Sequence, residues 1–60
     1  MNYAIRTKKH RAVCWQGDAE RIMEVYEEKC SETDKYEIVN VFGGVVSIQT
    51  IIDEFNAGDL

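Results

Sequence analysis

Residues 36–48, YEIVNVFGGVVSI, decide the fold of this 60-residue chain because they contain its clearest β-hairpin. Aromatic and β-branched residues, which favour strands, lie on both sides of Gly43-Gly44. Paired glycines supply the positive φ angles that a two-residue hairpin turn needs. Neighbouring positions such as Ile38 and Val39 are both apolar, so we expect both faces of this hairpin to be covered.

A helix is predicted directly after this hairpin. Thr50 can cap it with Asp53 three residues later, in a capping-box arrangement, and Ser47 is the alternative capping residue. Gly58 suits the end of the helix. The apolar positions at helical spacing are Ile48, Ile51, Ile52 and Phe55.

The N-terminal part of the chain predicts a second hairpin and helix. Apolar and polar residues alternate in short stretches over residues 3–15, which favours two strands joined near residues 8–10, with one longer strand as the alternative. Asp18 is a good N-cap for a helix over residues 19–30. The apolar stripe of that helix is Ile22, Met23, Tyr26 and Cys30, with Val25 at its edge.

These elements predict one α+β domain over residues 1–60, in the order ββα-ββα. The expected architecture is a small antiparallel sheet with both helices packed on one face. The other face then needs solvent or a second copy of the chain. Because a 60-residue chain buries only about 60% of its unfolded surface, we expect a homodimer. Its predicted interface is Val39, Val41, Val46 and Ile48.

Charge is segregated along the chain, whose formal net charge is −4. From Asp18 onward, the sequence contains eleven acidic residues and only three basic ones. A chain with this distribution can pair head to tail or present an acidic face to a basic partner. The acidity of the whole chain argues against general affinity for nucleic acid. The predicted partner-binding residues are the helix acids Glu20, Glu24, Glu27 and Glu28 and the N-terminal bases Arg6, Lys8, Lys9 and Arg11. The alternatives are a solvated helix face and an edge strand whose charges block sheet extension.

The chain lacks an evident catalytic or metal-binding constellation. His10 and Cys14 are four residues apart, about 13 Å along a strand, so they meet only if a turn brings them together. Cys14, Cys30 and His10 are too few and too scattered for a structural zinc site. We therefore predict no catalytic residues, no metal and no cofactor. Two unpaired cysteines and the absence of a signal peptide at the start predict a reduced, cytoplasmic protein.

The segment from Lys8 to Asp18 resembles the opening of small tailed-phage and prophage proteins of unassigned function. The shared positions are Lys8, Lys9, Ala12, Trp15, Gly17 and Asp18, followed by a helix. His10 stands where that set usually has proline. The resemblance implies an accessory protein made in the bacterial host cytoplasm, of a kind that often binds and blocks a host protein such as an antiviral defence factor or a nuclease.

The sequence therefore predicts a non-enzymatic homodimer that binds and inhibits a host protein. One alternative is a nucleic-acid-binding module that uses the basic N-terminal hairpin. The other is a structural or regulatory subunit of a phage particle. No membrane association is expected.

Overall fold

The strands and helices follow one another as two ββα units, as predicted. The computed structural model describes residues 2–58, and there the chain forms four strands and two helices, the first of which continues into a π-helical turn. In chain order the elements are β1 (Asn2–Thr7), β2 (Val13–Asp18), α1 (Ala19–Val25), η1 (Tyr26–Cys30), β3 (Tyr36–Asn40), β4 (Val45–Val46) and α2 (Ile48–Gly58). The α+β class is confirmed, and the N-terminal segment is a hairpin rather than one long strand.

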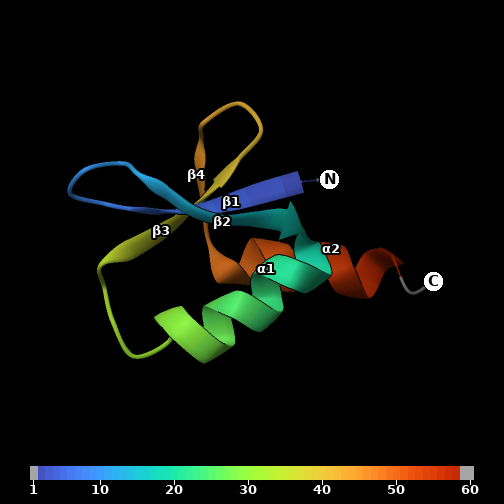
Figure 1. Ribbon diagram of the computed structural model, residues 1–60. Coiled ribbons are helices and arrows are strands. Elements are labelled where there is room, and N and C mark those ends of the chain that lie inside the picture. The colour runs from blue at the N-terminus through green and yellow to red at the C-terminus, as the bar shows by residue number, and fades with distance from the viewer. Residues whose placement is uncertain (1, 59–60) are drawn as a thin grey trace.

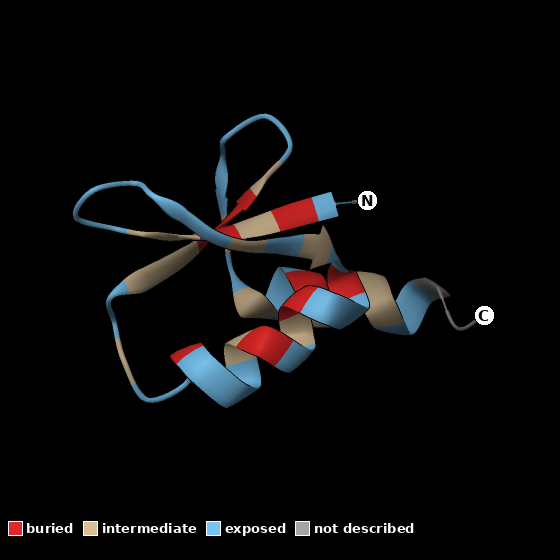
Figure 2. Cartoon of the chain, in the orientation of Figure 1, coloured by how far each residue is buried: buried red, intermediate tan, exposed pale blue. Residues whose placement is uncertain are grey.

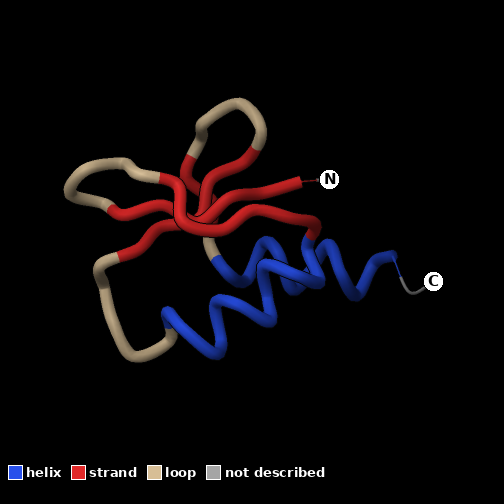
Figure 3. Tube along the Cα trace, in the orientation of Figure 1, coloured by secondary structure: helices blue, strands red, loops and turns tan. Residues whose placement is uncertain are grey.

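The two units share one antiparallel sheet. Its strand order is β2-β1-β3-β4, so β1 lies between its own hairpin partner and the first strand of the second unit. Ile5 lies level with Trp15 on β2 and Ile38 on β3. Both helices lie on the same side of the sheet, below it in Figures 1 and 3, which confirms the expected layering.

Alternation along the strands separates a covered face from an open one. Tyr3, Ile5 and Ile38 belong to the core beneath the helices. Their neighbours in the chain point the other way. The open face consists of Ala4, Arg6, Gln16, Glu37, Val39 and Val45, which the strand register places side by side. The register shifts between Ile5 and Arg6, where Cys14 is the extra residue of a β-bulge.

Asp18 caps α1, as the sequence predicts. Its Oδ1 accepts a hydrogen bond of 2.9 Å from the backbone N–H of Arg21. Gly17 does not break the strand, because β2 continues to Asp18 and the helix starts at the next residue. A Cβ atom on Gly17 would lie 2.8 Å from Cγ of Arg21, so this junction requires glycine for close packing.

The first helix differs from its prediction in its second half. Residues 26–30 form a π-helical turn instead of continuing the α-helix. In an α-helix Cys30 would point about 140° away from Val25 around the axis, whereas the wider turn brings residues five apart closer to one direction. Val25 and Cys30 are accordingly both buried, while Met23 and Tyr26, predicted for the core stripe, are only half-buried.

The predicted two-residue Gly-Gly turn is wrong. Residues 41–44 form a longer loop organised by Asn40, whose Oδ1 accepts hydrogen bonds of 2.9 Å from the N–H groups of Phe42 and Gly44. The N–H of Gly43, at a φ of 82°, donates to the Asn40 carbonyl oxygen. Side-chain hydrogen bonding thus replaces the tight turn and leaves Val41 and Phe42 outside the strands.

Ser47 is the capping residue of α2, which confirms the alternative over Thr50. The N–H of Thr50 donates to both Oγ (3.2 Å) and the carbonyl oxygen (3.1 Å) of Ser47. Asp53 instead accepts a hydrogen bond from Nε2 of Gln49, one turn earlier. The earlier start puts Ile48 inside the helix, on the same stripe as Ile51.

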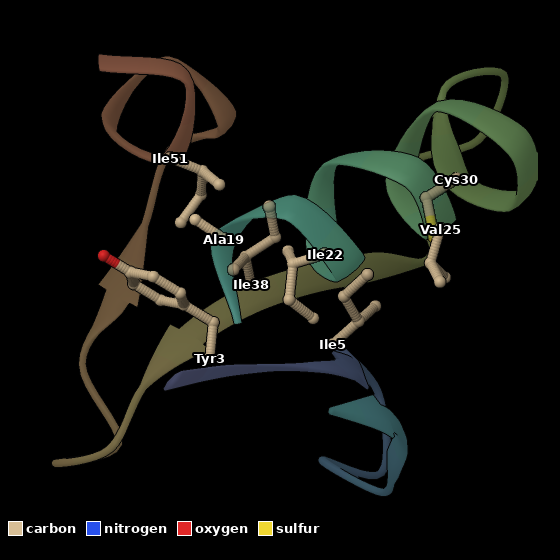
Figure 4. Packing of buried hydrophobic residues seen from close by; sticks show 8 residues of the cluster. All are labelled: Tyr3, Ile5, Ala19, Ile22, Val25, Cys30, Ile38 and Ile51. Carbon is tan, nitrogen blue, oxygen red and sulfur yellow. The ribbon is translucent and has the colours of Figure 1, made fainter. Parts of the chain in front are cut away.

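The core lies between the sheet and the helices, where the buried colour concentrates in Figure 2. Figure 4 shows side chains from β1, β3, α1, η1 and α2 pointing toward one another there. The cluster consists of Tyr3, Ile5, Ala19, Ile22, Val25, Cys30, Ile38 and Ile51. Trp15 and Tyr36 extend it with an edge-to-face ring contact of 5.5 Å between centroids.

Candidate functional site

The predicted acidic residues gather on the outer side of α1 and η1. Packing of the opposite side of this helix against the sheet turns the acids outward. The four carboxylates belong to Glu20, Glu24, Glu27 and Glu28, all exposed. The structure therefore brings them together as one acidic surface, and this name is used for these four residues below.

An apolar groove lies beside the acidic surface, between the first helix and α2. It has a volume of about 340 Å³ and is lined by Met23, Tyr26, Glu27, Ser31, Ile48 and Ile52. Glu27 belongs to both features, so a carboxylate stands at the edge of an apolar hollow. We call this feature the helix groove. Its apolar side chains are half-buried, which means that neither helix covers them completely.

Sequence reasoning missed the helix groove because it treated the apolar residues of each helix as one stripe and assigned Ile48 to a dimer interface. Met23 and Ile52 are only half-buried in the structure, and both line the groove. The signal in the sequence is that each stripe contains two adjacent apolar residues, Ile22-Met23 and Ile51-Ile52, which widen its apolar side.

Three of the four predicted basic residues form a second cluster. Lys8, Lys9 and Arg11 are exposed in the β1–β2 loop, at the left in Figure 1. Arg11 adopts a left-handed φ of 54°, and its N–H donates to the Thr7 carbonyl oxygen over 2.8 Å. The N–H of Lys8 donates to the carbonyl oxygen of Lys35, so a fourth base, which the sequence did not indicate, joins this basic loop.

Arg6 stands apart from the other predicted bases. It lies on the open sheet face, where its Nε donates to Oε2 of Glu37 across 2.5 Å. Both side chains are mostly buried, at 19% and 17% exposure. Arg6 is separated from Lys8 because it lies within β1, paired with Glu37 on the adjacent strand, whereas Lys8 lies beyond the end of β1 in the loop.

The predicted dimer interface of Val39, Val41, Val46 and Ile48 is wrong as a single surface, because the four residues lie on different sides of the sheet. Val39 and Val41 line a shallow hollow of about 690 Å³ on the open face. Val46 and Ile48 pack against the core under the helices instead. Val46 pairs with Ile38 in the sheet and therefore shares its inward direction, while Ile48 already belongs to α2.

Two buried groups have perturbed protonation. The Tyr3 hydroxyl donates to a carboxylate oxygen of Glu54, and this bond, with burial and the nearby negative charge, raises the pKa of Tyr3 above its ordinary value. Burial, with a smaller effect of Cys14, raises the pKa of the Cys30 thiol. Both groups belong to the core cluster, so their protonation bears on the stability of the fold.

The residues considered for catalysis and metal binding lie in different surroundings: His10 and Cys14 are exposed, while Cys30 is buried. The Cys14 thiol is directed to the Ala12 carbonyl oxygen at 3.6 Å. Residues 2–58 contain no group of three or more histidine, cysteine or acidic residues placed to hold a metal ion. In the same part of the chain, no helix is long and apolar enough to cross a membrane.

Comparison of the chain with models of known protein families finds no match, and comparisons with curated proteins and with solved structures find none either.

Proposed function

We propose that this protein is a non-enzymatic binding domain whose acidic surface and helix groove together cover a basic, partly apolar surface of another protein. The observation that carries the proposal is the adjacency of the two features. Glu27 lines the apolar groove and also belongs to the row of four exposed carboxylates. Charge steers the encounter, and apolar burial holds the complex.

The groove specifies the chemistry of the partner. Met23, Tyr26, Ile48 and Ile52 offer a soft, apolar floor, and methionine adapts its shape to varied side chains. The partner segment that fits is a helix or strand with one large apolar side chain flanked by lysine or arginine. Such amphipathic segments are a recurring mode of protein recognition.

A phage setting supplies a reason for such a surface. The resemblance of the segment from Lys8 to Asp18 to small phage proteins favours a host protein as the partner, in the bacterial cytoplasm. Nucleases and other proteins that act on nucleic acid carry basic surfaces, because they neutralise phosphates. A row of carboxylates can occupy such a surface in place of nucleic acid, which would inhibit the partner.

The test compares two single charge reversals of equal size. We expect Glu24→Lys to lower the affinity for a captured and identified host protein at least about tenfold, since the substitution replaces attraction with repulsion. Asp34→Lys, in the exposed loop before β3, is the matched control and is expected to leave the affinity unchanged. Affinity is measured by calorimetry. Equal effects of the two reversals would contradict the proposal.

A second candidate function is nucleic-acid binding by the basic loop. The observation in its favour is the backbone hydrogen bond from Lys8 to Lys35, which brings Lys35 to the loop that also contains Lys9 and Arg11. If these side chains contact phosphates, the affinity for an oligonucleotide should fall steeply between about 50 and 200 mM salt. The variant Lys9→Glu should lose binding in a gel-shift series, and Lys29→Glu, on η1, should retain it. No complex at low salt would eliminate this candidate.

A further inference from the structure

The hollow on the open face forms around a small side chain at the middle of β1. Ala4 lies level with Gln16 on β2 and Val39 on β3, and all three residues line the hollow. A methyl group between two longer side chains leaves a depression in the sheet surface. Its volume of about 690 Å³ lies within the usual range of small-molecule sites, which is about 300–1,000 Å³.

The lining of the hollow combines an apolar floor with polar groups at its sides. Ala4 and Val39 form the floor, and Val39 is only 5% exposed. Asn2 and Arg6 stand on either side of Ala4 along β1, each about 7 Å away, because alternate residues of a strand share a face. Among the described residues that line the hollow, Arg6 alone carries a charge. The site therefore suits a ligand with an apolar body and one anionic group.

Arg6 keeps hydrogen-bond donors for such a ligand. Its Nε donates to Glu37, which leaves the four N–H groups of the two Nη atoms. Within residues 2–58 no buried side-chain nitrogen or oxygen lacks a hydrogen-bond partner, so Nη atoms without a partner reach the accessible surface, where Arg6 lines the hollow. Glu37 is absent from the lining. Its carboxylate therefore holds the guanidinium in place without occupying the hollow.

We propose that this hollow binds a small carboxylic acid with a flat apolar body. The ligand carboxylate accepts hydrogen bonds from the Nη atoms of Arg6, whose planar guanidinium matches the geometry of a carboxylate. The apolar body lies on Ala4 and Val39, and the side-chain amide of Gln16 is close enough in the register to donate to the ligand.

The charges around the hollow favour a carboxylate over a phosphate. The guanidinium of Arg6 already shares its charge with Glu37, so a second anion is best accepted when it carries one negative charge rather than two. The acidic surface lies on α1 and η1, on the other side of the sheet, and leaves the hollow free. This site is distinct from the acidic surface and the helix groove, and it does not depend on the proposed function.

The test is a titration of the isotope-labelled chain with benzoate, followed by the backbone amide signals in nuclear magnetic resonance. Benzoate should shift the signals of Ala4, Gln16 and Val39 in a saturable way, with a dissociation constant of about 1 mM for so small a ligand. Benzamide has the same ring without the charge and should bind at least about tenfold more weakly. Inorganic phosphate should give no saturable shift at these residues.

Two variants locate the site. Ala4→Val fills the centre of the hollow, keeps the pair of Arg6 and Glu37, and should abolish benzoate binding. Valine favours strands, so circular dichroism should show unchanged folding. The double variant Arg6→Gln with Glu37→Gln removes both charges together and should reduce benzoate binding to the level of benzamide. Glu24→Gln, on the acidic surface, is the control and should bind benzoate as the wild type does.

Four results would overturn the proposal. They are the absence of saturable shifts with benzoate at millimolar concentrations, equal binding of benzamide and benzoate, binding that survives Ala4→Val in a folded chain, and shifts confined to the residues of the helix groove. Loss of benzoate binding in both open-face variants, with binding retained in Glu24→Gln, would support it.

Discussion

The two faces of the sheet bury neighbouring residues by different means. Ile38 and Val39 follow one another on β3 and are 3% and 5% exposed. Ile38 is buried beneath the helices within the core cluster, whereas Val39 forms the floor of a hollow that is bordered by strands and a hairpin loop. Ile38 and Val39 are therefore buried to a similar extent, but Ile38 lies in the core that the helices enclose, whereas Val39 lies on the face that the helices do not cover.

This difference explains how a short chain can combine a small core with an interaction surface. The covered face uses the helices to enclose apolar side chains from five elements. The open face has no second layer in residues 2–58 and carries apolar residues at its rim instead. Substitutions on the two faces should consequently differ in the size of their effect on folding.

The largest effect is expected for Ile38→Ala on the covered face. Removal of a fully enclosed isoleucine side chain leaves a cavity and costs about 2–5 kcal/mol. Since a domain of 60 residues has about 3–9 kcal/mol in total, the variant should lose a large share of its stability. Urea denaturation followed by circular dichroism measures the loss.

A smaller loss is expected for Val39→Ala, the next residue on the same strand. The substitution removes two methyl groups, worth about 1.5 kcal/mol at roughly 0.8 each, but the open hollow gives no enclosed cavity to add a further penalty. Both substitutions place alanine in β3, so the strand propensity changes little between them. A loss for Val39→Ala equal to that for Ile38→Ala would show that the two faces are equally enclosed.

Alkaline pH should lower the stability of the fold by deprotonating Tyr3 and Cys30, which lie on the covered side of the sheet. The pKa values of Tyr3 and Cys30 are raised, so the folded chain holds both protons more tightly than the unfolded chain does. Their contribution is complete below the ordinary thiol value of 9.0 and is lost as the pH rises through the raised folded values. The free energy of unfolding should be level at neutral pH and fall in alkaline solution.

The variant Tyr3→Phe isolates the tyrosine part of this dependence. Loss of its hydrogen bond to Glu54 should lower stability at neutral pH by about 1 kcal/mol. The alkaline decrease should then be shallower than in the wild type, because one of the two titrating groups is absent. Urea denaturation at a series of pH values checks this, and an unchanged alkaline slope would contradict the role of Tyr3.

The smallest effect on folding is expected for Phe42→Ser in the loop between β3 and β4. An 89% exposed side chain contributes little to the single chain, so stability should stay within about 0.5 kcal/mol of the wild type. Urea denaturation followed by circular dichroism measures the difference. A loss as large as that of Val39→Ala would place Phe42 inside the fold of one chain.

Much of the fold and part of the candidate site were predictable from local chemistry. The Asp18 cap, both hairpins and both helices follow from hydrogen-bonding groups and periodicity within short windows. The exposure of the helix acids follows from the same periodicity. The loop around Asn40 was not predictable in this way, since a strand residue there replaces the glycine turn with side-chain hydrogen bonds. The π-helical turn also escaped prediction, because its advantage lies in bringing Cys30 to the core.

Periodicity and capping residues in the chain were thus enough to establish which segments are strands and helices, because those preferences act between residues a few positions apart. Which apolar residues meet which neighbours was decided by packing between segments far apart in the chain. Val46 pairs with Ile38, and its side chain therefore points toward the core. Arg6 pairs with Glu37 on the open face, and its side chain therefore does not belong to the basic loop. In a strand that is apolar on both faces, alternation separates the two sets of side chains but does not say which set the helices will cover.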